Sequence, residues 1–292
     1  MRRLFVLLAA CGGSEPSATA PDASAPKVDA PDPALGPAIP HSTGTCPPIV
    51  DGDVTFAPAG IAPRKVKLAL TTGAPSPGPL LIYWHATYSS PSEASYALGT
   101  THTQLLNDGG IIAAPYSDDS AGMFEWFAVN GSTREDDFVL ADEIVGCLVE
   151  AGRVDATRIH SLGMSAGGLQ TTALSFLRAS YIASVATFSG GLPADYNPPN
   201  TDTPNKFAAL IFEGGSSDNV FGLDFQAASK KYRDVLSAHD HFAALCEHDG
   251  GHEIPLDAAP SVRTFFIANP YGAWPSPYVT GLPSSFPTYC GL

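Results

Sequence analysis

From residue 46 onward, short apolar runs alternate along the chain with longer segments in which apolar residues recur every three or four positions. Several runs are continuously apolar, such as LLIYW at 80–84, which is typical of parallel strands covered on both faces. The expected strands are Val66–Thr71, Leu80–Ala86, Ile111–Tyr116, Arg158–Gly163, Ser184–Ser189, Ala208–Gly214 and His241–Glu247. The expected helices are Glu135–Ala151, Gly168–Ala179, Phe225–Ala238 and Pro260–Ala268. This alternation predicts an α/β fold, a three-layer sandwich with a mainly parallel central sheet.

The first residues, MRRLFVLLAAC, combine two arginines, a short apolar core and small residues before a cysteine. This pattern resembles the bacterial lipobox and predicts a lipoprotein-type signal over 1–11, with Cys11 as the lipidated residue. An ordinary secretory signal and a misassigned start are the alternatives. Residues 12–45 are rich in Pro and Ala and have no aromatic residue, which predicts a disordered tether. The catalytic domain is then expected over 46–292.

The charge balance removes several classes of partner. The chain has 292 residues with 15 Lys and Arg against 29 Asp and Glu, a net charge of −14. A nucleic-acid binder needs a basic face, and so does a protein that docks on anionic lipid. The longest apolar stretch, residues 4–10, is far shorter than the ~20 residues of a spanning helix. Contact with a membrane is therefore expected only through the anchor, and the oligomeric state stays open.

Four cysteines remain beside Cys11, an even number that indicates two disulfides in an exported chain. Three pairings are possible. Because Cys46 opens the expected domain and Cys290 nearly closes the chain, we favour Cys46–Cys290 and Cys147–Cys246. Four buried free thiols are the alternative.

The main chemical signal is G-x-S-x-G at 163–167, which follows the strand RIHSL and precedes a helix. A nucleophilic serine needs a sharp turn from strand to helix, with small flanking residues, so that its hydroxyl stands above the sheet. Ser165 is therefore the expected nucleophile. A serine that only caps a helix is the alternative.

A serine hydroxyl needs a base, and the base needs an orienting acid, in the order Ser, Asp or Glu, His on such a sheet. Asp218 ends a Gly/Ser turn after an apolar strand, and His252 lies in a loop after the next strand. Both loops are expected where the carboxyl ends of the strands converge. The competing acids are Asp224, Asp234 and Glu213, and the competing base is His248.

Two backbone N–H groups should stabilise the oxyanion. We expect one from Ala166, directly after the nucleophile, and the other from Ala86 or Thr87 in the loop after LLIYW. Among the aromatic residues near these segments, Trp126 and Tyr88 are the favoured substrate-binding residues, although core packing is the alternative for each.

These motifs resemble the α/β-hydrolase superfamily, and within it the secreted esterases related to polyhydroxybutyrate depolymerases, feruloyl esterases and acetylxylan esterases. The resemblance covers about residues 48–268 and rests on GMSAGG at 163–168, the turn ending at Asp218, CEHDGGHEIP at 246–255 and MFEWF at 123–127. The His-Gly usual in that group is His85-Ala86 here, which predicts a different backbone shape in the oxyanion loop.

The resemblance implies hydrolysis of carboxylic esters, small or polymeric, by Ser165, Asp218 and His252 through an acyl-enzyme, with no metal or organic cofactor. Two other hypotheses remain: a peptidase on the same scaffold, and a surface lipoprotein that binds without catalysis. The cluster of His and Cys at 239–252 suggests zinc only weakly, because a strand through 241–247 would spread these side chains over two faces.

Overall fold

The computed structural model describes residues 36–198, 201, 203 and 205–292. The signal segment, Cys11 and the tether before residue 36 lie outside the described residues, so their predictions stay untested. None of the helices in the described part is long and apolar enough to cross a bilayer.

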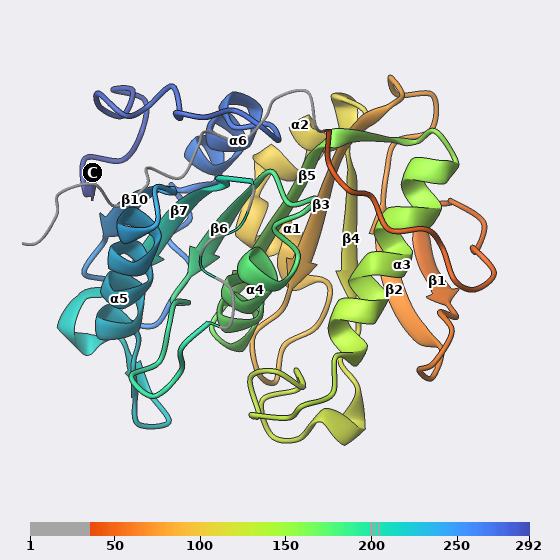
Figure 1. Ribbon diagram of the computed structural model, residues 1–292. Helices are drawn as coiled ribbons and strands as arrows, with labels where there is room; N and C mark the ends of the chain where they lie inside the picture. The colour runs from red at the N-terminus through yellow and green to blue at the C-terminus, as the bar shows by residue number, and fades with distance from the viewer. Residues whose placement is uncertain (1–35, 199–200, 202, 204) are drawn as a thin grey trace, which may run out of the picture. The chain divides into compact units, whose positions relative to one another are not determined.

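A nine-stranded sheet with the order β1-β2-β4-β3-β5-β6-β7-β10-β11 forms the centre of the domain (Figure 1). The strands from β4 through β3, β5, β6 and β7 to β10 are parallel, whereas β1, β2 and β11 pair antiparallel. Their bounds are β1 Gly52–Phe56, β2 Arg64–Ala69, β3 Gly78–Trp84, β4 Ile111–Pro115, β5 Val154–Met164, β6 Ser184–Phe188, β7 Ala208–Glu213, β10 Phe242–Glu247 and β11 Cys290–Gly291. A separate hairpin consists of β8 Asn219–Val220 and β9 Leu223–Asp224.

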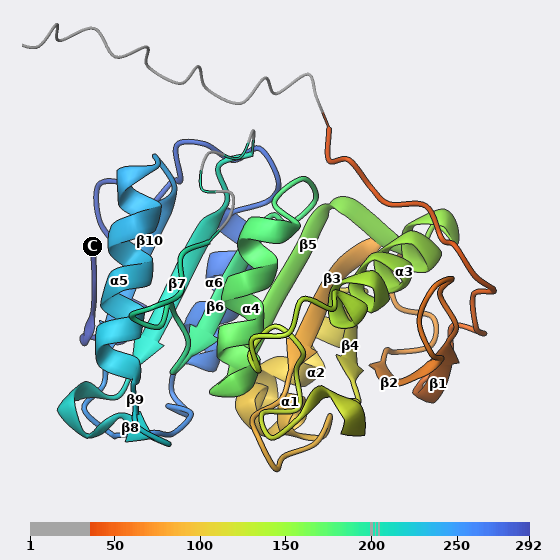
Figure 2. The same cartoon turned by 60° about the horizontal axis from the view of Figure 1, so that its bottom comes forward.

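Helices cover both faces of this sheet (Figures 1 and 2). One layer contains α3 Asp136–Glu150, α4 Ala166–Leu177 and α5 Phe225–Ala238, and the other contains α1 Glu93–Leu98, α2 Thr100–Asn107 and α6 Ala259–Ala268. Side chains of β3 alternate between two apolar clusters, with Leu80 and Ile82 toward the first layer and Leu81 and Tyr83 toward the second. Because every residue of β3 is buried, its sequence is apolar throughout. The predicted three-layer α/β sandwich is therefore confirmed.

The predicted strands and helices are all present, with ends displaced by a few residues, and α5 matches its expected range. Six strands and α-helices of the described chain were not predicted: β1, α1, α2, β8, β9 and β11. Most of them are short, and α2 has only two leucines among threonine, histidine, glutamine and asparagine. They therefore lack the apolar period by which longer elements are recognised.

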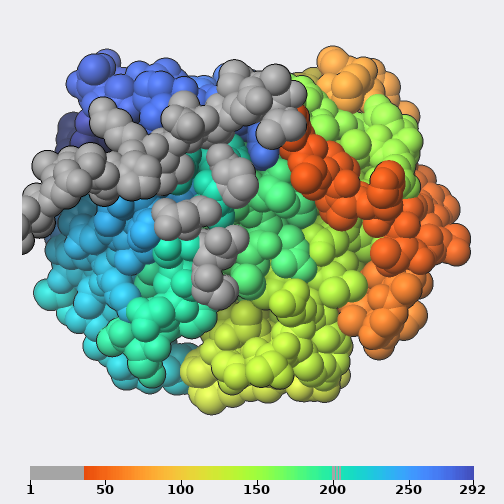
Figure 3. All heavy atoms as spheres, viewed as in Figure 1, coloured from red at the N-terminus to blue at the C-terminus, as the bar shows by residue number. Residues whose placement is uncertain are grey.

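Residues 36–45 differ from the expected tether, because they lie against the domain (Figure 3). The Ala38 amide donates to the Ser180 carbonyl at 2.9 Å. The buried Glu143 carboxylate on α3 accepts from the amides of Thr43 and Gly44 at 2.6 and 2.9 Å. A Pro- and Ala-rich composition allows an extended segment to dock in this way when a carboxylate meets its amides, so the boundary at 45 is wrong by at least ten residues.

Two disulfides join Cys46 to Cys147 and Cys246 to Cys290. The expectation of two disulfides is confirmed, but the favoured pairing, Cys46–Cys290 with Cys147–Cys246, is wrong. Cys46 lies near β1 at one edge of the sheet, whereas Cys290 is in β11 at the other, eight strands away. At about 4.8 Å per strand, that distance far exceeds the ~7 Å that a disulfide allows between Cα atoms.

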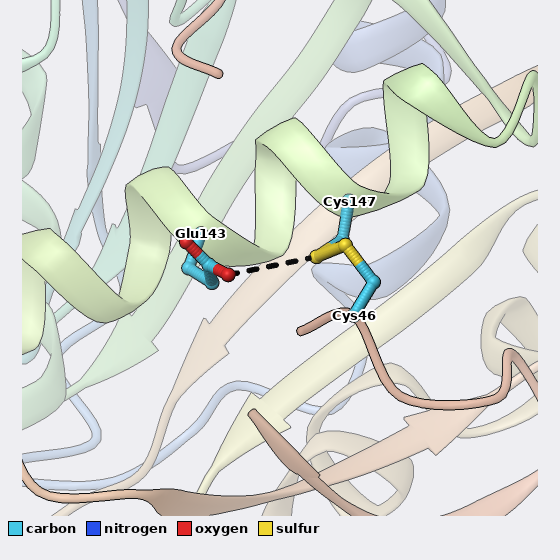
Figure 4. Close-up of side chains that lie close together, drawn as sticks. All are labelled: Cys46, Glu143 and Cys147. Atoms are coloured by element: carbon cyan, nitrogen blue, oxygen red, sulfur yellow. Dashed lines mark hydrogen bonds between the residues drawn. A yellow bond between two sulfur atoms is a disulfide. The ribbon is translucent and has the colours of Figure 1, made fainter. Parts of the chain in front are cut away.

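Glu143 lies beside the first disulfide, as Figure 4 shows, so that one carboxylate and two sulfurs are close together. This group does not have the chemistry of a metal site, since metal-binding cysteines are thiolates and both sulfurs here are bonded to each other. Cys246, one of the residues considered above as a zinc ligand, is likewise in a disulfide, with Cys290.

Removing the first disulfide is expected to destabilise the domain strongly. The Cys46→Ala/Cys147→Ala variant releases a loop with a sequence separation of 101. The loss of this constraint on the unfolded chain should lower the free energy of unfolding by about 4 kcal/mol. Urea unfolding measures the change. Cys246→Ala/Cys290→Ala, with a separation of 44, is the matched control and should lose somewhat less. A loss below about 1 kcal/mol for the first variant would contradict the entropic argument.

Candidate active site

Ser165 occupies the sharp turn between β5 and α4. Its φ of +56° and ψ of −119° are outside the usual regions for residues with a side chain. The turn also requires glycine beside it, because a Cβ on Gly167 would lie 1.9 Å from the Trp84 carbonyl oxygen. The Ser165 amide donates to the Phe188 carbonyl at 2.9 Å, which ties the turn to β6. The chain thus holds a serine in a strained turn at the end of a buried strand, the arrangement of a nucleophile elbow.

Two further predicted residues lie next to this serine. His252 Nε2 is 2.8 Å from Ser165 Oγ, and His252 Nδ1 is 2.7 Å from Asp218 Oδ1. The loops that carry the acid and the base are in direct backbone contact, because the Gly251 amide donates to the Gly214 carbonyl at 2.9 Å. A Cβ on Gly214 would lie 1.8 Å from the Gly251 carbonyl oxygen, so glycine is needed there. Three side chains far apart in sequence therefore form one hydrogen-bonded chain.

The Asp218 carboxylate is buried, and its second oxygen also accepts hydrogen bonds. Oδ2 accepts from Ser189 Oγ at 2.8 Å and from the Gly214 amide at 2.9 Å. The Phe225 ring lies 4.6 Å from the His252 ring and covers it. Ser189 and Phe225 were missed from the sequence, since neither position belongs to a recognisable motif. Both restrict the orientation of the histidine and its acid.

The competing acids and base lie elsewhere. Asp224 accepts from the Ala227 amide as the cap of α5, and Asp234 pairs with Arg233. Glu213 is fully buried and accepts from the Gly215 amide, and burial raises its pKa. His248 receives a hydrogen bond from the Gly250 amide instead of contacting the serine. Among these candidates, only His252 and Asp218 are connected to Ser165 in the described part of the chain.

The predicted oxyanion donors do not all remain available. The Ala86 amide donates to Glu93 Oε1 at 3.0 Å, so Ala86 is ruled out as a donor, and the prediction for it is wrong. The Tyr88 amide is also used, by Glu125 Oε2 at 3.1 Å. The Thr87 amide donates to no group within the described residues, and the Ala166 amide opens α4, where a helix provides no partner. Thr87 and Ala166 stay the predicted donors.

Glu93 fixes the shape of this loop from α1. Its Oε1 accepts from the Ala86 amide and from the Tyr83 hydroxyl, at 3.0 and 2.9 Å. Glu93 was not predicted as a functional residue, because the helix that carries it, α1, was not predicted either. One feature of the sequence could have identified Glu93: it is an acidic residue at the start of a helix, seven residues after Ala86.

Loss of this carboxylate is expected to impair catalysis without removing any reacting group. Glu93→Ala frees the Ala86 amide and lets the loop move, and a displacement of about 1 Å lowers kcat by about 100-fold. Glu93→Gln is the matched control, because the amide oxygen of Gln accepts both hydrogen bonds and should retain most of the activity. Steady-state kinetics of both variants measure the effect, and equal loss in both would show that charge, and not loop shape, matters.

Neither of the two favoured substrate-binding residues lines the cavity beside Ser165. Trp126 is fully buried, packs edge-on against Trp84 at 5.0 Å and donates from its indole nitrogen to the His85 carbonyl at 3.0 Å. It holds the loop that follows β3 and has no exposed surface, so the prediction that it contacts substrate is wrong. Tyr88 is 74% exposed and does not line the cavity beside Ser165. The large apolar side chain of Trp126 is better accommodated in the core, which is the alternative that the sequence left open.

A cavity of about 240 Å³ opens beside Ser165. Its lining includes Thr87, Phe124, Ser165, Ala166, Leu169 and Phe221. The segment that contributes Phe124 is anchored by Asp137, whose carboxylate accepts from the Phe127 amide at 2.7 Å and from Arg64 at 3.2 Å. Burial raises the pKa of Asp137 to about 6, although Arg64 opposes this shift. Ser165 and the two residues that carry the predicted oxyanion amides, Thr87 and Ala166, therefore line a common, mostly apolar space.

No family model matches the chain, and no curated protein matches it in sequence. Solved structures do match. The native form of a protein called pOPH superposes with a TM-score of 0.69 at 16% identity, over 84% of this chain and 95% of that one. A CE1 ferulic acid esterase from Anaeromyces mucronatus gives 0.52 at 16% identity over 75% and 90% of the two chains. An S-formylglutathione hydrolase from Agrobacterium tumefaciens gives 0.54 at 13% identity over 76% and 94%.

At these identities, the similarity concerns the fold. The sheet order, the layers of helices and the turn at Ser165 agree with it. The chain has the α/β-hydrolase fold.

Proposed function

We propose that this protein is an exported serine carboxylesterase that hydrolyses carboxylic esters through an acyl-enzyme. The observation that carries the proposal is the hydrogen-bonded series of Ser165, His252 and Asp218 at 2.8 and 2.7 Å. The fold is shared with solved structures that are named as a ferulic acid esterase, a thermostable esterase and an S-formylglutathione hydrolase, which favours ester chemistry.

In the first half of the reaction, Ser165 Oγ attacks the ester carbonyl carbon and its proton passes to His252 Nε2. The amides of Ala166 and Thr87 stabilise the oxyanion that forms. Asp218 keeps the proton on Nδ1 and stabilises the imidazolium. When the tetrahedral intermediate collapses, the bond to the alcohol oxygen breaks and His252 returns the proton to that oxygen.

In the second half, water replaces the alcohol. His252 takes a proton from this water as it attacks the acyl carbon, and the proton then passes to Ser165 Oγ as the acyl bond breaks. The products are a carboxylic acid and the free enzyme. The substrate classes suggested by the sequence resemblance are polyhydroxyalkanoate-like polyesters, feruloyl or acetyl esters of polysaccharides, and small esters.

Export is supported by the two disulfides, since structural disulfides persist in oxidising compartments. The lipid anchor at Cys11 remains a separate prediction.

Labelling with a fluorophosphonate probe tests the proposed serine directly. Intact mass and peptide mapping are expected to show one adduct on Ser165, and none in His252→Ala. Turnover of a carboxylic ester should exceed that of the amide of the same acid. A folded, oxidised protein that takes up no probe and hydrolyses no ester would contradict the proposal and favour a non-catalytic binding role. Faster cleavage of amides would instead indicate a peptidase.

A further inference from the structure

The hairpin β8–β9 lies directly between the proposed acid and the helix that covers the histidine. Val220 pairs with Leu223, so only Phe221 and Gly222 form the turn. The Phe225 amide donates to the Asp218 carbonyl at 2.9 Å and closes the hairpin at its base. In Figure 2 the hairpin and the segment between β4 and α3 lie at the same end of the sheet. Two segments far apart in sequence thus border the same region.

Phe221 is an unusual residue for its position. Its φ is +54° and that of Gly222 is +78°, the values of a two-residue hairpin turn that favours Asn-Gly. A phenylalanine held in this left-handed region costs about 1–2 kcal/mol. The residue is also 59% exposed, so it gains little from burial in return. The fold alone therefore does not account for a phenylalanine at the tip.

Within the part of the chain that the structure describes, the Phe221 ring has one aromatic partner, and this partner comes from the segment between β4 and α3. It packs edge-on against Phe124 at 5.6 Å between ring centres and 69° between planes. Both rings line the cavity of about 240 Å³ that contains Ser165. The aromatic pair therefore joins two loops at the wall of the cavity that Ser165 also lines.

The cavity is suited to an uncharged, apolar group. None of its lining residues has an ionisable acid or base, and Val129, Leu169 and Pro193 are shared with an adjoining cavity of about 270 Å³. An apolar chain that starts at Ser165 can therefore continue past Leu169. The exposed Asp195 lies along the second cavity and disfavours an anionic end there.

The position of the reacting groups indicates which part of an ester enters. Ser165 and the amide-bearing residues Thr87 and Ala166 line the cavity, whereas His252 does not. The histidine must face the leaving alcohol, because it gives that oxygen a proton. The part of the ester in the cavity is then the acyl chain.

Resting on the proposed function, we propose that Phe221 and Phe124 form an aromatic clamp that determines specificity. The clamp selects uncharged esters with an extended apolar acyl chain, which lies against the packed pair of rings and is directed past Leu169. The strained backbone at Phe221 is retained for this contact and not for stability.

The test is Phe221→Asn, since asparagine suits the turn but cannot form the clamp. Its kcat/KM for 4-nitrophenyl hexanoate is expected to fall about tenfold, mainly through KM, with smaller falls for the butyrate and the acetate. The melting temperature should not fall, and should rise if strain is relieved. Tyr96→Asn, which replaces an aromatic residue that is 61% exposed on α1, is the matched control and should change none of the profiles.

Equal falls for all three esters, or a loss of stability in Phe221→Asn without a change in specificity, would overturn the clamp. Comparison of methyl hexanoate with hexyl acetate separates the two sides of the ester, and a larger effect on hexyl acetate would overturn the acyl assignment.

Binding separates the clamp from the proposed function. Calorimetry with methyl hexanoate on Ser165→Ala, alone and combined with Phe221→Asn, measures the contact without turnover. If the wild-type protein hydrolyses no ester but binding weakens about tenfold in the double variant, the clamp stands and the esterase proposal fails. If esters are hydrolysed but binding is unchanged, the clamp fails and the esterase proposal stands.

Discussion

Ser165→Ala is expected to lower kcat for ester hydrolysis by about a millionfold, because the variant has no oxygen to form the acyl-enzyme. The remaining rate, still above that in water, would come from the oxyanion donors and from binding. The fold should persist, since the strained turn is held by the backbone bond to Phe188 and by close packing, and not by the hydroxyl. Alanine also tolerates this turn no worse than serine does.

Turnover of 4-nitrophenyl acetate, with circular dichroism to confirm folding, measures the effect. Ser95→Ala, an exposed serine on α1 whose hydroxyl donates to the Ser92 carbonyl, is the matched control and should keep full activity. A folded Ser165→Ala variant with more than a hundredth of the wild-type rate would show that another group performs the attack.

Asp218→Asn is expected to lower kcat by about 10⁴-fold, because it changes which nitrogen of the histidine carries the proton. The Ser189 hydroxyl and the Gly214 amide both donate to Oδ2, so the oxygen of the introduced amide would turn toward these two donors. The NH₂ group of the same amide would then face His252 Nδ1 and force this nitrogen to accept. The proton would move to Nε2, which could no longer take one from Ser165.

The control for charge is Asp234→Asn, since this carboxylate is exposed and pairs with the neighbouring Arg233. It should leave kcat unchanged. Should Asp218→Asn retain more than a tenth of the wild-type kcat, the carboxylate would not orient the base, and the proposed triad would be reduced to a pair.

The sequence was sufficient where a local pattern has a single structural meaning. Continuous apolar runs predicted the parallel strands, because a strand covered on both faces needs no polar positions. The G-x-S-x-G turn predicted the position of Ser165 because only small flanking residues allow the close approach to Trp84. The Asp218 and His252 loops followed from their place after strands that end at the same edge.

The sequence was insufficient where the role of a residue depends on contacts between distant parts of the fold. The cysteine pairing depends on which edge of the sheet each cysteine reaches, and spacing does not contain that information. The Ala86 amide is taken by Glu93 from a helix with little apolar period. From the sequence, Trp126 could line a pocket or pack in the core. Only its contact with Trp84 and its hydrogen bond to the His85 carbonyl show that it packs in the core.

The pairing of β11 with β10 has a consequence for how the protein behaves in solution. A strand at the border of a sheet presents unpaired N–H and C=O groups on which another chain can add. Here the two residues of β11 cover part of that border on β10, and Cys246 and Cys290 lie directly opposite each other across the pair. The disulfide makes the cover permanent while the protein is oxidised. Reduction would allow the C-terminal segment to separate and would leave β10 open to edge-to-edge aggregation.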